Sequence, residues 1–165
     1  MNNKKLLTVL FHGIITGCLA VYLVVAAIFF ILPARGYEMY IVESGSMVPA
    51  LKVGSLIFVD TNNKAPDVGD VMTYKIGENG MEKLVTHRVI AIENGEFVTK
   101  GDANDYEDFA PIPKENVVGK CEYSIPKLGF LIDAFQRNKY TVFLGAGLIV
   151  LWVISFFMVE ELKRQ

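Results

Sequence analysis

Glu43-Ser44-Gly45-Ser46-Met47-Val48-Pro49 joins two short apolar runs with the composition of β-strands, Met39–Val42 and Leu56–Val59. Glycine between two serines permits a tight turn at little steric cost, and proline fixes the direction in which the chain leaves. A serine on such a turn can present its hydroxyl and its own N–H on one side, as a nucleophile with an oxyanion donor requires. Stretches of Ser, Gly and Pro are also common in plain surface loops. The rest of the chain must decide between a nucleophile and a loop.

Apolar runs of strand length recur through the middle of the chain, and turn signals separate them. Asn79-Gly80 and Asn94-Gly95 are strong signals for tight hairpins. None of the runs has a sustained period of 3.6 residues, so we expect an all-β domain. The expected strands are Tyr40–Val42, Leu56–Asp60, Val71–Ile76, Leu84–Ile92, Glu96–Lys100 and Val117–Ile125.

Two long runs contain no charged residue, in a chain of 165 residues of which 52% are hydrophobic. Residues 6–32 form the first run and residues 140–159 the second. As a helix, the first would span roughly 40 Å, against a hydrocarbon core of about 30 Å. It is far longer than the apolar region of about 7–15 residues in a cleavable signal peptide. We therefore expect both runs to be transmembrane helices that remain in the protein.

Positive charges flank the outer end of each run, at Lys4-Lys5 and at Lys163-Arg164. Such residues favour the cytoplasmic side of a membrane. We therefore expect residues 1–5 and 160–165 to be cytoplasmic. Residues 33–139 would form an extracytoplasmic domain, inserted between two spans of a multi-pass cell-membrane protein.

The composition of residues 33–139 excludes several classes of function. Twelve basic and sixteen acidic residues give a net charge of −4 without a basic patch, which argues against nucleic acid as a partner. Cys18 lies in the first long run and Cys121 in the middle domain, so they cannot pair. With two histidines in the chain, and His12 near the membrane edge, a zinc site is not expected.

His87 is the histidine outside the two long runs, and it lies within the expected strand Leu84–Ile92. A strand supports a general base rigidly, although an ordinary core or edge histidine would occupy the same kind of position. Asp102 and Asp108 follow in an acidic stretch, and either carboxylate could orient the imidazole of His87. The alternative is that this stretch is an ordinary solvated loop, since such loops are often equally acidic. Lys83 is an alternative base, in a Ser/Lys mechanism.

Three motifs in this order resemble the type I signal peptidases, specifically the endoplasmic-reticulum-type subclass, which is also found in archaea and some Gram-positive bacteria. They are Ser44–Pro49, His87–Ile90 and Gly101–Asn104 with Asp108 beyond, and the similarity runs from about Ile41 to Gly129. The resemblance implies a signal-peptidase-like β-domain and a serine nucleophile with a histidine base where the bacterial subclass has lysine. The implied roles are nucleophile Ser46, base His87, third member Asp108 in preference to Asp102, oxyanion support by Ser44 and structural support by Arg88. Val48, Ser55 and Ala103 depart from residues common in the family, but none of them is a reacting group.

The resemblance therefore predicts a membrane-anchored signal peptidase I, which cuts signal peptides from secreted preproteins after small residues. Its partners would be preproteins and the lipid bilayer, without metal or other cofactor, and the sequence leaves accessory subunits undetermined. A substrate would extend along the strand edge Met39–Glu43. The alternative is a non-catalytic, membrane-tethered β-domain that scaffolds an envelope assembly. Lys127–Lys139 would lie at the bilayer surface or form an ordinary connecting helix.

Overall fold

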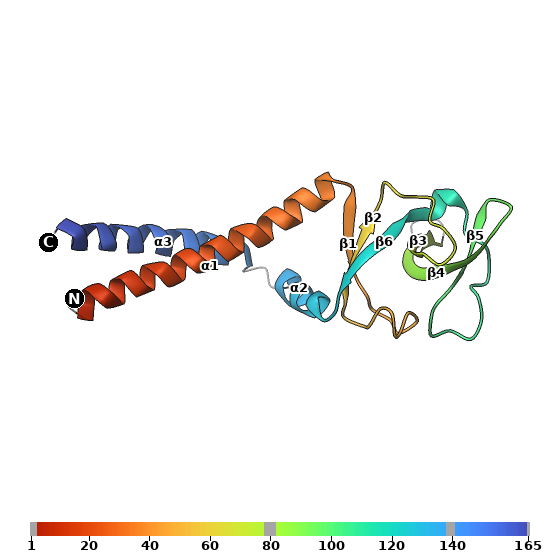
Figure 1. The fold of residues 1–165 in the computed structure, drawn as a ribbon, viewed down its shortest axis with the longest axis horizontal. Coiled ribbons are helices and arrows are strands. Elements are labelled where there is room, and N and C mark those ends of the chain that lie inside the picture. Colours follow the sequence, from red (N-terminus) through yellow and green to blue (C-terminus); the bar gives the residue numbers. More distant parts are fainter. Residues whose placement is uncertain (1–2, 78–81, 138–140, 165) are drawn as a thin grey trace. The chain divides into compact units, whose positions relative to one another are not determined.

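Six antiparallel strands form one sheet in the computed structural model, which describes residues 3–77, 82–137 and 141–164. The strands lie in the order β1-β2-β6-β3-β4-β5, so the last strand of the chain occupies the middle of the sheet (Figure 1). A long apolar helix precedes the sheet and another follows it, which confirms the expected fold class. The strands are β1 (Tyr37–Ile41), β2 (Leu56–Asp60), β3 (Val71–Ile76), β4 (Lys83–Glu93), β5 (Glu96–Lys100) and β6 (Val117–Ile125).

The first strand differs most from its expected bounds. It begins at Tyr37 rather than Tyr40, and Val42 lies just beyond its end. Glu38 interrupts the apolar run in the sequence, yet it pairs within the β1–β2 ladder and accepts a hydrogen bond from the Tyr40 hydroxyl. Strands β2, β3, β5 and β6 have the expected bounds, and β4 is one residue longer at each end.

A two-residue turn at Asn94-Gly95 connects β4 with β5, as the sequence predicted. Both residues have positive φ, 52° and 86°, which matches the twist of the flanking strands and explains the Asn-Gly pair. The other expected hairpin turn, Asn79-Gly80, lies outside the described residues.

Buried apolar side chains form two clusters in the sheet domain. The first cluster comes mainly from β3, β4, β5 and β6, and it contains Tyr74, a core residue with a polar hydroxyl. The second anchors the connection between β1 and β2 through Met47, which is 1% exposed. Both clusters therefore border the segments that carry the candidate site. The first comprises Met72, Tyr74, Val89, Phe97, Ile112 and Val117, and the second Met47, Leu51, Ile57 and Val59.

Helices α1 (Asn3–Ala34) and α3 (Thr141–Arg164) pack against each other. Residues with higher numbers in α1 contact residues with lower numbers in α3, so the two helices are antiparallel. Asn3 and Arg164 therefore lie at the same end of the pair (Figure 1). The contacts are His12 Nδ1 with Ser155 Oγ at 2.9 Å, Trp152 Nε1 with Thr16 Oγ1 at 3.1 Å, and the Tyr22 hydroxyl beside Gly145.

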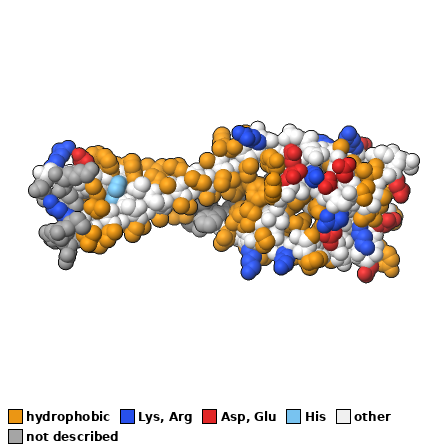
Figure 2. Space-filling view, viewed as in Figure 1, with side chains coloured by type: hydrophobic (Ala, Val, Ile, Leu, Met, Phe, Trp, Pro, Cys, Tyr) orange, Lys and Arg blue, Asp and Glu red, His pale blue; other side chains and the backbone are white. Residues whose placement is uncertain are grey.

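Both long helices have apolar stretches of sufficient length to cross a membrane, at Lys5–Ala34 and Leu144–Glu161. Figure 2 shows hydrophobic side chains along the visible face of the helical pair and charged side chains spread over the visible face of the sheet domain. These two helices suggest membrane anchoring. The expected spans, residues 6–32 and 140–159, fall within them, apart from Tyr140, which lies outside the described residues.

Helix α2 (Leu128–Arg137) occupies most of the segment Lys127–Lys139, of which Lys139 lies outside the described residues. Its first turn packs on the β1–β2 connection, where Gly129 lies against the backbone of Gly54. A side chain at position 129 would not fit there. The side chains of Phe130 and Leu131 are 56% and 59% exposed. The segment is therefore helical, and its position at a bilayer surface stays a prediction.

Candidate active site

Ser46 lies on the connection between β1 and β2, directly before the buried Met47. The apolar side chain of Met47 fixes this turn in the core, so its neighbour is held in place while remaining partly exposed. Two backbone hydrogen bonds tighten the turn, from the Val48 N–H to the Gly45 carbonyl at 3.0 Å and from the Leu51 N–H to the Met47 carbonyl at 2.8 Å. The serine is thus mounted on an ordered turn, not on a loose loop.

His87 lies in the middle of β4, and its side chain is nearly buried. It pairs with Met72 of β3 and points from the sheet toward the serine turn. His87 Nε2 lies 3.1 Å from Ser46 Oγ, although 41 residues separate the two in the sequence. This is hydrogen-bond distance, and it is the reach that a general base needs.

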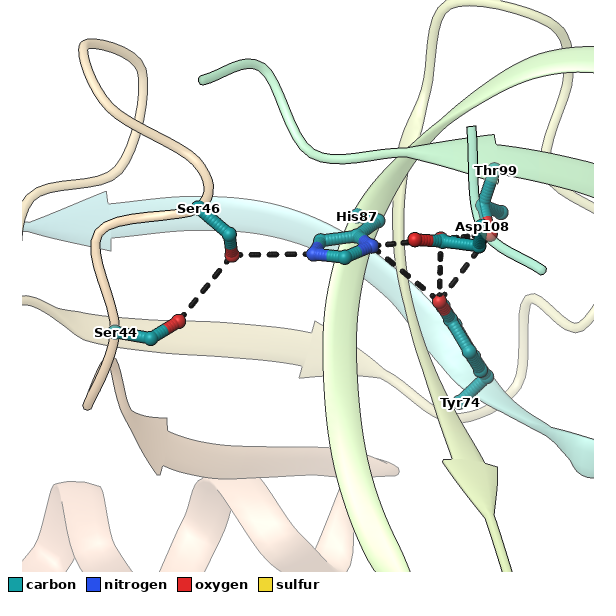
Figure 3. A network of polar contacts seen from close by, with 6 residues as sticks. All are labelled: Ser44, Ser46, Tyr74, His87, Thr99 and Asp108. Carbon is teal, nitrogen blue, oxygen red and sulfur yellow. Dashed lines mark hydrogen bonds and ion pairs between the residues drawn. The ribbon is translucent and has the colours of Figure 1, made fainter. Parts of the chain in front are cut away.

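Asp108 completes a chain of hydrogen bonds on the other side of the imidazole (Figure 3). Its Oδ2 lies 2.7 Å from His87 Nδ1, and it also accepts hydrogen bonds from the hydroxyls of Tyr74 and Thr99. Burial disfavours the charged carboxylate, but the hydrogen bonds from Thr99, His87 and Tyr74 outweigh burial and lower the pKa of Asp108 below its usual value. The carboxylate is therefore ionised at neutral pH.

The ionised carboxylate determines where the protons lie. Because it can only accept hydrogen bonds, His87 Nδ1 carries the proton and Nε2 is left to accept from the Ser46 hydroxyl. Ser44 Oγ lies 3.2 Å from Ser46 Oγ and, by the same counting, donates to it. The three groups Ser46, His87 and Asp108 thus have the arrangement of a serine hydrolase triad, with a second hydroxyl beside the serine (Figure 3).

Asp102 lies in the same loop as Asp108 but has different partners. It binds the Arg88 guanidinium through two hydrogen bonds, at 2.8 and 2.7 Å, and Arg88 also donates to the Gly69 carbonyl at 2.8 Å. The next residue, Ala103, donates its N–H to the Ser46 carbonyl at 2.8 Å. The structure therefore brings Asp108 to the imidazole, while Asp102 braces the loop that holds the serine turn.

Lys83, the alternative base, is exposed at the first residue of β4. Four residues of extended strand separate it from His87, a distance of about 13 Å. Sequence reasoning missed Tyr74 and Thr99, because a tyrosine and a threonine within strands look like ordinary strand residues. Only the pairing of β3, β4 and β5 reveals that their hydroxyls converge on Asp108.

No protein-family model matches the chain. Curated relatives do, and each is named as the signal peptidase complex catalytic subunit SEC11. The protein from Komagataella phaffii is 29% identical over 138 residues, covering 73% of this chain and 78% of the relative. Those from Eremothecium gossypii and Saccharomyces cerevisiae are each 30% identical, over 124 and 122 residues, and the matches cover 73% and 72% of those relatives.

The fold and the site define a serine hydrolase-like β-domain associated with apolar helices. By its similarity to these relatives, the chain belongs to the endoplasmic-reticulum-type signal peptidase family, a family of serine peptidases.

The bracing role of Asp102 predicts a loss of stability when its charge is removed. Asp102→Asn should lower the free energy of unfolding by about 1 kcal/mol, because two charge-assisted hydrogen bonds to a partly exposed arginine are weakened. Thermal unfolding of the full-length protein in detergent measures this effect. Asp105→Asn, on the exposed part of the same loop, is the control, and equal effects of the two changes would contradict the bracing role.

Proposed function

We propose that this chain is a membrane-anchored serine endopeptidase, signal peptidase I, that removes N-terminal signal peptides from secreted preproteins after small residues. The single observation that supports it most is the ordered line of hydrogen bonds from Ser46 through His87 to Asp108. The relatives named as catalytic subunits of a signal peptidase complex support the choice of substrate.

In the proposed mechanism, His87 Nε2 takes the proton of Ser46 as the serine oxygen attacks the scissile carbonyl. The Ser46 N–H and the Ser44 hydroxyl would donate to the developing oxyanion. His87 would then protonate the leaving amine and activate water to release the acyl group. Asp108 would stabilise the imidazolium without taking its proton, and Arg88 with Asp102 would support the site from outside the reacting atoms.

A preprotein would bind in extended form along β1. This strand lies at one edge of the described sheet, so an added strand could pair with its outer edge over Met39–Ile41, and the rest of the expected segment Met39–Glu43 continues beyond the strand. The serine turn follows this strand directly, which would place the scissile bond beside Ser46. Small residues before the cut are what signal peptides supply.

We also propose that both termini are cytoplasmic and that residues 33–139 are extracytoplasmic, with α1 and α3 as the two spans. The antiparallel packing of the two helices supports this topology, because it places Asn3 and Arg164 at the same end of the pair. Positive residues occur next to those ends. The lipid bilayer would then be a permanent partner, and the site would face the compartment into which preproteins emerge.

The base can be identified with three variants of the full-length protein, assayed in detergent on a labelled preprotein. Ser46→Ala and His87→Ala should abolish cleavage, because each removes a group that takes part in acyl transfer. Lys83→Ala should retain near-normal turnover. Cleavage that survives Ser46→Ala would overturn the proposed activity and favour the non-catalytic scaffold. If Ser46→Ala and Lys83→Ala abolish cleavage while His87→Ala retains it, the protein would use a Ser/Lys mechanism.

Replacing each of the two aspartates with asparagine should change kcat to different extents. Asp108→Asn should lower kcat by up to about 10⁴, the loss seen in another triad when the imidazole takes the wrong tautomer. Asp102→Asn should lower kcat much less, because Asp102 acts on the loop and does not touch the imidazole. Initial rates on the same preprotein measure both effects. An active Asp108→Asn with an inactive Asp102→Asn would reverse the assignment.

Cysteine labelling of intact cells tests the topology. In a Cys18→Ser/Cys121→Ser background, Lys64→Cys in the exposed β2–β3 connection should react with a membrane-impermeant maleimide. Arg164→Cys at the end of α3 should react only after the membrane is permeabilised. The opposite pattern would show that the sheet domain is cytoplasmic.

A further inference from the structure

We propose that Tyr74 and Thr99 are positioning residues of the triad, whose hydroxyls hold the Asp108 carboxylate and thereby select the His87 tautomer that can accept the Ser46 proton. The inference rests on the proposed function for its effect on catalysis. Its effect on the tautomer can be measured without a substrate.

The two hydroxyls and the imidazole meet at one atom. Asp108 Oδ2 lies 2.7 Å from the Tyr74 hydroxyl, 2.5 Å from Thr99 Oγ1 and 2.7 Å from His87 Nδ1 (Figure 3). Tyr74 and Thr99 are 1% and 0% exposed, so water does not compete for these hydroxyls. Thr99 also accepts the Asp108 N–H through its own carbonyl at 2.8 Å, which fixes the backbone of the aspartate at the same place.

Counting protons gives one consistent arrangement. Tyr74 has one proton, and burial together with the charge of Asp108 raises the pKa of its phenol above the usual value, so the proton stays. Thr99 also has one proton, and its distance to Asp108 Oδ2, 2.5 Å, is shorter than its 3.2 Å to the Tyr74 hydroxyl. Both protons therefore go to the carboxylate. The tyrosine oxygen is also 3.4 Å from His87 Nδ1, too long to compete with the 2.7 Å bond from Nδ1 to Asp108.

Strand pairing explains how these groups meet. Met72 is directly opposite His87, and Tyr74, two residues further along β3, is its diagonal neighbour on the same face. Thr99 of β5 is opposite Val89 of β4, which is two residues beyond His87. Three adjacent strands thus each contribute one donor to a carboxylate that comes from a loop. His87 from β4 and Tyr74 from β3 are the titratable groups that face it.

Packing alone does not require these hydroxyls. Phenylalanine has the shape of tyrosine without the polar oxygen, and valine has the shape of threonine, so an apolar core could fill both positions. Buried hydroxyls are costly unless they are paired, and here the shortest partner of each is the Asp108 carboxylate. The choice of Tyr74 and Thr99 therefore serves the site.

The test uses Tyr74→Phe and Thr99→Val in the full-length protein, with a labelled preprotein in detergent. Each should lower kcat by about tenfold with little change in KM, because one donor to an ionised group is lost. Losing a donor also raises the pKa of Asp108, so the part of the kcat/KM pH profile that depends on the ionised Asp108 should move to higher pH.

Two control variants separate positioning from packing. Thr99→Ser keeps the hydroxyl and should restore the wild-type pH profile. Thr73→Val removes a buried hydroxyl from the residue beside Tyr74, where it pairs with Thr86 at 2.9 Å and touches none of the triad. It should change the thermal midpoint without changing the pH profile.

The tautomer is measured by ¹⁵N NMR of the histidine ring, with His87 assigned by comparison with His12→Gln. The wild type should show protonated Nδ1, and Tyr74→Phe and Thr99→Val should each show a mixture of tautomers. Unchanged tautomer and pH profile in the two variants would overturn the inference, even if both melt at lower temperature. If Tyr74→Phe does not fold, Thr99→Val decides alone. If the wild type has protonated Nδ1 and cleaves no preprotein, while the two variants show mixed tautomers, the proposed function would be overturned and this assignment of Tyr74 and Thr99 would stand.

Discussion

Strand β4 pairs with β3 on one side and β5 on the other, and the register of these ladders places His87 beside the carboxylate that the hydroxyls of Tyr74 and Thr99 bind. A slip of one residue in either ladder would turn His87 or its neighbours to the opposite face. The Asn94-Gly95 turn fixes the β4–β5 register next to the hairpin, and an irregularity between Val89 and Ala91 shifts that register by one residue before Thr99 pairs with Val89. The position of His87 relative to Tyr74 and Thr99 is therefore set by the sheet.

One loop, between β5 and β6, contributes two carboxylates to different tasks. Near its start, Asp102 binds Arg88 and the adjacent Ala103 N–H holds the Ser46 carbonyl. Further on, Asp108 meets the imidazole and is held by Thr99. The loop thus connects the serine turn with the histidine strand. Two acidic residues six positions apart in sequence are not interchangeable, because one faces a guanidinium and the other an imidazole.

Much of the fold could be predicted from sequence, because each strand is an apolar run bounded by turn residues. The start of β1 could not, since Glu38 interrupts the apolar run, and only its pairing with β2 and its bond to Tyr40 show that the strand includes it. Family resemblance selected Ser46, His87 and Asp108, and the structure brings them together; their chemical roles stay predictions. Tyr74 and Thr99 gave no signal in the sequence, because a donor to a distant carboxylate is defined only by long-range pairing.

The strand order has a consequence for the newly made chain. The hairpin β1–β2 carries Ser46, and strands β3, β4 and β5 carry His87 and the partners of Asp108; in the described sheet, β6 is the strand that joins these two halves. Strand β6 is also the last to leave the ribosome. Until it inserts, the serine turn has no sheet register with respect to the histidine, and closing the β2–β6 pairing must span about sixty residues of chain, which makes it a slow step. A sheet built in this way cannot hold Ser46 and His87 in their final register until β6 has inserted.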